Sequence, residues 1–95
     1  MTRRPDPAAQ LLRALARAAA ATGCAAELRH EALVPWASAT FNGGQHRVAV
    51  AGPALDAWLD TLADADLPLI GHFVASLAVD RDGAGAVLTV LVLED

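Results

Sequence analysis

The spacing of apolar residues along the first quarter of the chain is helical. Between Ala8 and Thr22, apolar side chains recur every three or four positions, as they do on the buried face of an amphipathic helix. These residues are Leu11, Leu12, Leu15, Ala16 and Ala19. Asp6 followed by Pro7 is typical of a helix start, and Gly23 is typical of a helix end. The pattern therefore predicts a helix that begins after Asp6 and ends before Gly23.

An alternation of apolar and polar residues follows, and it predicts three strands. The first strand begins at Ala25 and is broken by Pro35, and the second covers residues 36–41. Asn42-Gly43 is a residue pair that favours a tight type I′ hairpin turn. The third strand is expected over residues 45–51.

The second half of the chain predicts one more helix and two more strands. The helix opens at Gly52-Pro53, and its apolar residues have i, i+3, i+4 and i+7 spacing. These residues are Leu55, Trp58, Leu59 and Leu62. Strands are expected over residues 69–79 and 86–93, joined by an Asp- and Gly-rich turn over residues 80–85.

This order of elements predicts an α+β fold. Residues 1–5 are expected to form a flexible tail, and residues 6–95 a single domain with the order α-β-β-β-α-β-β. Short links between strands require antiparallel pairing, so the expected architecture is a two-layer sandwich with two helices on one face of a roughly five-stranded antiparallel sheet. The pattern leaves the order of the strands in the sheet open.

The last expected strand is apolar on both of its faces. One face would carry Ala86, Leu88, Val90 and Val92, and the other Val87, Thr89, Leu91 and Leu93. A strand with one solvated face alternates apolar with polar residues, so both faces of this sheet are expected to be covered. The helices can cover one face, and a second copy of the chain is the expected cover of the other.

We therefore expect a homodimer that forms through the helix-free face of the sheet. The candidate interface residues are Leu88, Val90, Leu91 and Val92, and the pattern does not decide which of the two sets faces the partner. A different protein partner, or an apolar ligand held by a curved sheet, are the alternatives that the same pattern leaves open.

Charge and composition narrow the classes of partner. The net charge is −4, and the basic excess is confined to the first 20 residues, so binding to nucleic acid is disfavoured. All seven basic residues are Arg, which is typical of a bacterial GC-rich genome. The uncharged stretch over residues 67–79 is too short to cross a bilayer, so no membrane partner is expected. Cys24 is the single cysteine, which excludes an internal disulfide and favours a cytoplasmic location.

Three histidines are the best candidates for chemistry. His30, His46 and His72 fall on three different expected strands, in phase with apolar neighbours. They lack the close spacing that preforms a metal site, so we expect no metal and no cofactor. Together with Trp36, Ser38 and Thr40, which share one face of an expected strand, they could instead line a small polar pocket. Ordinary strand alternation explains the same pattern without a pocket.

The expected function is a small homodimeric interaction or accessory domain. The alternative is a small-ligand-binding protein or minor enzyme that uses the pocket just described. No catalytic motif supports an enzyme, because Ser38 and Ser76 lack the glycines of a nucleophile elbow. If the two helices pack antiparallel on the sheet, the acidic row Asp56, Asp60 and Asp64 could face Arg13 and Arg17.

Overall fold

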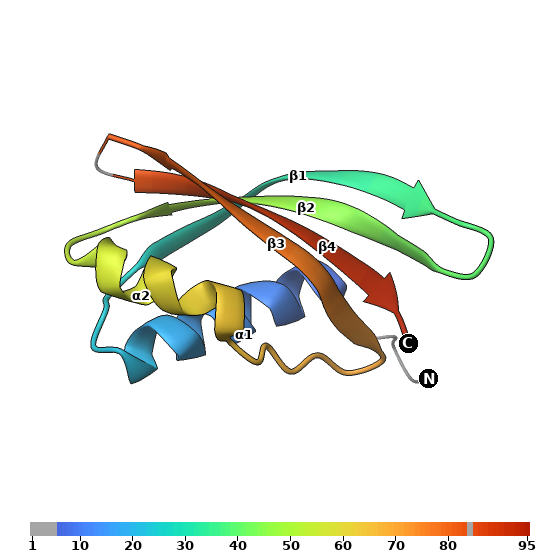
Figure 1. Cartoon of the computed structure of the whole chain (residues 1–95), viewed down its shortest axis with the longest axis horizontal. Coiled ribbons are helices and arrows are strands. Elements are labelled where there is room, and N and C mark those ends of the chain that lie inside the picture. The colour runs from blue at the N-terminus through green and yellow to red at the C-terminus, as the bar shows by residue number, and fades with distance from the viewer. Residues whose placement is uncertain (1–5, 84) are drawn as a thin grey trace.

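The fold is a two-layer α+β sandwich, as expected, and it contains four strands where five were predicted. The structure, a computed structural model, describes residues 6–83 and 85–95, so the expected tail over residues 1–5 lies outside the described residues. Its elements are α1 (Pro7–Ala21), β1 (Glu27–Ala37), β2 (Asn42–Ala51), α2 (Leu55–Thr61), the 3₁₀ turn η1 (Leu62–Asp64), β3 (His72–Asp82) and β4 (Gly85–Glu94). Both helices lie on the same face of the sheet (Figure 1).

The ends of α1 follow from local sequence. The Asp6 side chain accepts a hydrogen bond of 3.0 Å from the Ala8 N–H, and Pro7 occupies the first helical position. At the other end, Gly23 has φ +77°, and the Gly23 and Cys24 amides donate to the carbonyls of Ala20 and Ala19. This pair of bonds is a Schellman motif, which requires the left-handed conformation that glycine adopts without strain.

The prediction of separate strands before and after Pro35 is wrong. β1 runs through Pro35 without interruption, because β1 is an edge strand and a proline there removes no ladder hydrogen bond from a central position. The hairpin turn is formed by residues 38–41 and not by Asn42-Gly43. Ser38 closes it: its N–H donates to the Phe41 carbonyl (2.8 Å), and its Oγ accepts from the Phe41 N–H (3.1 Å).

Gly43 and Gly44 lie inside β2, and crowding against backbone atoms requires a glycine at Gly43, whereas the atom nearest to Gly44 belongs to a movable side chain. A Cβ atom at Gly43 would collide with the Val92 carbonyl, and one at Gly44 would collide with the side chain of Leu33. The glycines that resemble a turn signal therefore allow β2 to approach its neighbours closely.

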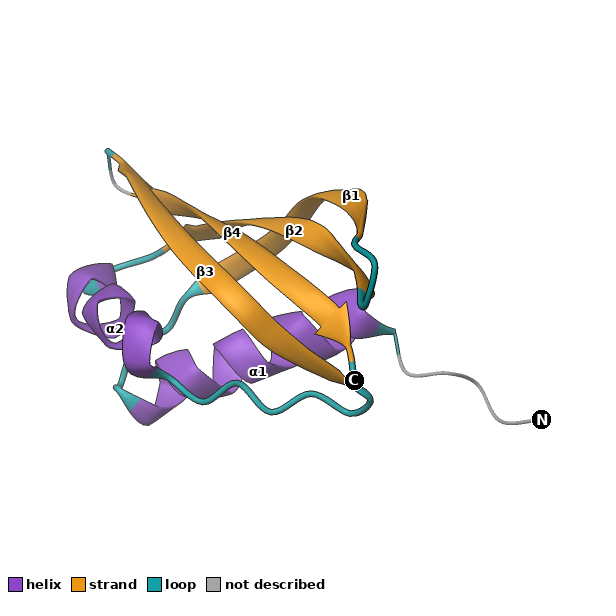
Figure 2. Cartoon of the chain, turned by 45° about the vertical axis from the view of Figure 1, so that its right-hand side comes forward, coloured by secondary structure: helices purple, strands orange, loops and turns teal. Residues whose placement is uncertain are grey.

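The four strands form one antiparallel sheet in the order β1-β2-β4-β3. α2 carries the chain from β2 to the far edge, and β4 then returns between β2 and β3 (Figure 2). β3 begins at His72 and not at residue 69, because Gln10 of α1 holds the preceding backbone. The Gln10 carboxamide accepts from the Ile70 N–H (2.6 Å) and donates to the Ile70 carbonyl (3.3 Å).

The hydrophobic core lies between the helices and one face of the sheet. α1 contributes Leu11 and Leu15, α2 contributes Trp58, and all three are fully buried. The sheet supplies Val48, Leu88, Val90 and Val92, which are also buried. The residues of β4 that the helices cover thus form the centre of the sheet's contribution to the core.

Two carboxylates of α2 form ion pairs with Arg81 and not with the expected residues of α1. The Arg81 guanidinium contacts the carboxylates of Asp56 (2.7 Å) and Asp60 (2.5 Å). Arg81 projects from β3 toward the helices, because it pairs with Ala86 on the covered face of the sheet. The expected pairing with Arg13 and Arg17 is therefore wrong.

Candidate functional site: the helix-free face of the sheet

The helices cover one of the two apolar faces of β4 and leave the other uncovered (Figure 1). Leu88, Val90 and Val92 face the helices and are 0–1% exposed, so these three predicted interface residues belong to the core and cannot reach a partner. The reason is that α1 and α2 already cover their side of the sheet (Figure 1). Leu91, the fourth predicted interface residue, alternates with them and lies on the opposite side.

The pairing register defines this opposite side, which we call the free face. Directly paired residues on neighbouring strands project from the same side of a sheet. Across β1, β2, β4 and β3 in turn, the rows of the free face are Trp36-Gly43-Leu93-Phe73, Val34-Gln45-Leu91-Ser76, Ala32-Arg47-Thr89-Ala78, Arg29-Ala49-Val87-Asp80 and Glu27-Ala51-Gly85-Asp82. The rows therefore change from apolar to charged along the strands.

One end of the free face is apolar and incompletely covered. We call it the apolar end: Val34, Trp36, Phe41, Phe73 and Leu91. Val34 is 60% exposed and Phe41 is 42% exposed, while the other three are half-buried. The Phe41 ring, from the turn between β1 and β2, packs edge-to-face on Phe73 with ring centroids 5.7 Å apart. Aromatic side chains gathered at one surface are typical of interface centres.

The other end of the free face carries charges of opposite sign on opposite edges. Arg29 and Arg47 project from β1 and β2, whereas Asp80 projects from β3. All three are exposed. Arg29 also contacts Glu31, at the bulge of β1, at 3.3 Å. Solvent screening makes such an exposed pair a weak contributor to stability.

Sequence patterning names Leu91 as an interface candidate, but it assigns Trp36 to a polar pocket, and its interface set leaves out Val34, Phe41 and Phe73. Val34 is missed because Pro35 resembles the end of a strand. The uninterrupted run of non-polar residues over positions 32–37, which continues through Pro35, is the signal that could have found it. The position of Phe41 against Phe73 depends on the pairing of β2 with β4 and of β4 with β3, which no local pattern contains.

Two of the predicted histidines, the half-buried His30 and the buried His46, meet on the covered side of the sheet. His30 Nε2 and His46 Nδ1 are 2.9 Å apart, and the two rings meet edge to face. His46 is 1% exposed. Burial lowers the pKa of His46 below its ordinary value of 6.5, and His30 and His72 lower it further, while Asp6 opposes them. His46 is therefore a neutral hydrogen-bonding partner near pH 7.

His72 approaches His46 across a small cavity. The cavity measures about 200 Å³, and its polar lining includes His46, His72 and Glu94. His72 Nδ1 lies 3.2 Å from the Ile70 carbonyl. Within residues 6–83 and 85–95, no group of three His, Cys, Asp or Glu side chains has a geometry that could hold a metal ion. The cavity thus offers hydrogen bonds to a small molecule, without a metal-ligand set.

The remaining predicted pocket residues lie elsewhere. Trp36 is on the free face, and Ser38 and Thr40 are in the turn, where the Ser38 Oγ accepts from the Thr40 N–H at 3.4 Å. The polar pocket that would combine them with the histidines therefore does not form. The physical reason is that a turn replaces most of the predicted strand 36–41, which removes the shared face.

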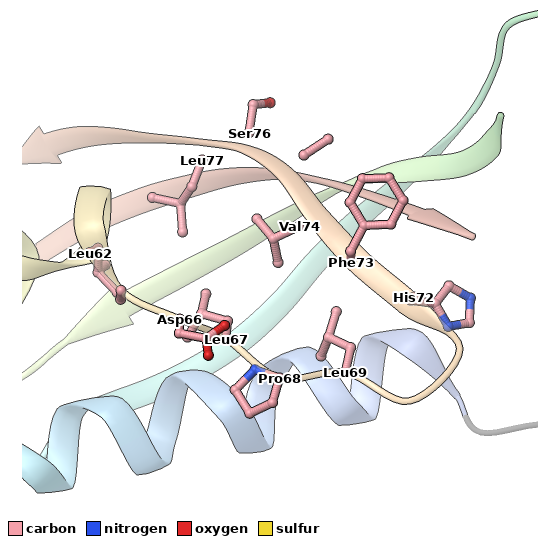
Figure 3. Close-up of a pocket in the computed structure, with 12 residues that line it drawn as sticks. Leu62, Asp66, Leu67, Pro68, Leu69, His72, Phe73, Val74, Ser76 and Leu77 are labelled. Atoms are coloured by element: carbon pink, nitrogen blue, oxygen red, sulfur yellow. The ribbon is translucent and has the colours of Figure 1, made fainter. Parts of the chain in front are cut away.

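A larger cavity lies along the outer edge of β3 and was not predicted. It measures about 450 Å³ and lies between β3 and residues 62–69 (Figure 3). Its lining is mainly aliphatic and includes Leu67, Leu69, Val74 and Leu77. Asp66 and His72 are the titratable groups of this lining. The described residues around the cavity form no recognisable catalytic arrangement.

Comparisons with protein-family models, curated proteins and solved structures find no match to this chain. Among the described residues, no helix has the length and apolarity needed to cross a membrane.

Proposed function

We propose that the protein is a homodimeric interaction domain that associates through the free face. The observation that supports this most strongly is the apolar end, where Val34 and Phe41 are exposed beside the half-buried Trp36, Phe73 and Leu91. Contiguous exposed apolar patches on a folded protein mark sites of interaction. Aromatic residues are enriched at the centres of such sites, and charged residues are depleted there.

The charge pattern favours a second copy as the partner. Arg29, Arg47 and Glu27 lie on the β1–β2 half of the free face, where two Arg outnumber one Glu, and Asp80 and Asp82 lie on the β3–β4 half. A surface with both signs separated in this way is complementary to itself after a two-fold rotation, and two-fold dimers are the commonest homo-oligomers. A partner of one dominant charge would be repelled by one of the two halves.

The structure offers less support for a small-ligand protein or minor enzyme. That alternative relied on histidines beside Ser38 and Thr40, and the fold separates the two groups. The cavity at His46 and His72 remains, but it lacks a metal-ligand set among the described residues.

The test is the molar mass in solution, measured by light scattering on a sizing column over a wide concentration range. We expect a dimer for the native chain. Val34→Asp places a carboxylate in the apolar end, so we expect the dissociation constant to rise by on the order of a hundredfold. Val34 is 60% exposed, so the monomer should tolerate this change.

Ile70→Asp is the matched control, because Ile70 is an aliphatic side chain 72% exposed and lies in the loop before β3, outside the free face. It should leave the mass unchanged. Circular dichroism of each variant checks that the fold is retained. A native chain that is monomeric at all concentrations would overturn the proposal, as would an equal loss of dimer in both variants.

A further inference from the structure

We infer that the two-fold axis of this dimer lies between the two packed sheets and runs parallel to the strands, opposite the boundary of β2 and β4. With this axis, β1 of each protomer packs over β3 of the other. The inference rests on the proposed homodimer and specifies its geometry. It is supported by two independent gradients on the free face, one along the strands and one across them.

The gradient along the strands is in polarity. Rows at one end contain Trp36, Phe73 and Leu91, whereas rows at the other end contain Arg29 and Asp80. An axis parallel to the strands keeps each row opposite the same row of the partner, so the apolar ends pack on each other. An axis across the strands with full overlap would place the charged end of each protomer on the apolar end of the other. That arrangement would desolvate Arg29 against Val34 of the partner subunit and would set Arg47 against its own copy, which is costly. With the axis parallel to the strands, Arg47 instead lies over Thr89 of the partner subunit.

The gradient across the strands is in charge. Arg29 on β1 and Asp80 on β3 lie in one row, connected through Ala49 and Val87. Rotation about an axis between β2 and β4 exchanges the two edges of the sheet. Arg29 of each protomer then lies over Asp80 of the partner subunit, and the dimer contains two such contacts. Opposed charges at these positions define the alignment of the two sheets.

Two acidic residues limit the extent of the interface. Glu27 and Asp82 occupy opposite edges of the last row, so the same rotation brings them toward each other. Both are exposed at the end of the sheet. Solvent there screens like charges, and the packed area therefore extends from the row of Trp36 to the row of Arg29.

Cysteine crosslinking tests the direction of the axis. Ala32 and Ala78 are exposed, lie at opposite edges of one row, and become opposed across the dimer only if β1 packs over β3. Two chains are prepared in a Cys24→Ala background, one with Ala32→Cys and the other with Ala78→Cys. Each chain alone, and an equimolar mixture after subunit exchange, is treated with a short bismaleimide at a concentration where light scattering shows dimers.

The expected result is a crosslinked dimer in the mixture and little crosslinking in either chain alone. The two copies of residue 32 are then separated across the sheet by about three strand spacings, or roughly 14 Å, and so are the two copies of residue 78. Crosslinking of the Ala32→Cys chain to itself, with none in the mixture, would place the axis across the strands and overturn the inference while leaving the homodimer intact. If light scattering finds monomers only, the proposed function itself fails.

Discussion

Among the described residues, His46 is a buried titratable side chain whose pKa differs between the folded and the unfolded chain. Its pKa is lowered, mainly by burial and then by His30, so the folded protein holds the neutral ring more strongly than the unfolded chain does. The unfolded chain therefore takes up a proton first as the pH falls below 6.5. Folding stability that is fully present above that pH is expected to fall until the pH passes the pKa of the folded state.

The measurement is urea denaturation between pH 8 and pH 5, at one protein concentration, of the native chain and His46→Gln. All other side chains, His30 and His72 included, are the same in both proteins. We expect the difference in unfolding free energy between native and variant to shrink as the pH falls. A difference that stays constant would show that His46 does not carry the pH dependence.

Residue types alone identify the histidines but not which of them meet. His30 and His46 come together because His30 pairs with Val48, which places His46, two residues along β2, diagonally across from it on the same face. This register depends on contacts along the whole hairpin, and local alternation does not contain it. The pattern assigns Ser38 to the same site for the converse reason, since the sequence of its turn alternates like a strand.

At the scale of elements, boundaries set by local chemistry are predictable and those set by tertiary contacts are not. Asp6, Pro7 and Gly23 define the ends of α1 through bonds to their own neighbours. By contrast, Pro35 is tolerated because β1 is at the edge of the sheet, and the start of β3 depends on Gln10 binding Ile70. Both facts involve residues far apart in the sequence.

The start of α2 contains a strained residue that can be relieved. Ala54, at the N-cap position, has φ +58°, a left-handed conformation that glycine adopts more easily than alanine. Glycine is also the better N-cap residue. We therefore expect Ala54→Gly to increase the free energy of unfolding by about 0.5–1 kcal/mol in urea denaturation.

Ala57→Gly is the matched control for this prediction. Ala57 is exposed within the same helix, where glycine costs about 0.5–1 kcal/mol relative to alanine. The two variants make the same chemical change at nearby positions and should shift stability in opposite directions. A loss of stability in both would contradict a relief of strain at Ala54.

For the whole molecule, the sequence predicts the layers but not the polarity of the exposed face. The apolar residues on both sides of β4 correctly indicate that helices cover one side of the sheet (Figure 1). The free face combines side chains from all four strands, so its apolar end and its opposed charges emerge only with the strand order β1-β2-β4-β3. The pattern places Leu91 on the side of β4 opposite Leu88, Val90 and Val92, but it does not decide which side is the outer one. It also cannot name the neighbours of Leu91 on other strands.

The charge pattern of the free face predicts that two defective homodimers can form one competent heterodimer. In the inferred dimer, Arg29→Asp sets two carboxylates against each other at each contact, and Asp80→Arg sets two guanidinium groups against each other. Each variant alone then contains two like-charge contacts, which should weaken its dimer by on the order of tenfold at low salt. Mixing the two variants restores two opposite-charge contacts, because each introduced charge meets its opposite on the other chain.

We therefore expect the heterodimer of the two variants to predominate in native mass spectrometry after subunit exchange. This preference should disappear when the exchange is carried out at high salt, where charges are screened. Both positions are exposed, so the monomer fold should persist in each variant. Arg13→Asp, on the outer surface of α1, is the control and should leave the dimer unchanged. Random assortment of the two variants at low salt, in a chain that does dimerise, would show that Arg29 and Asp80 do not meet.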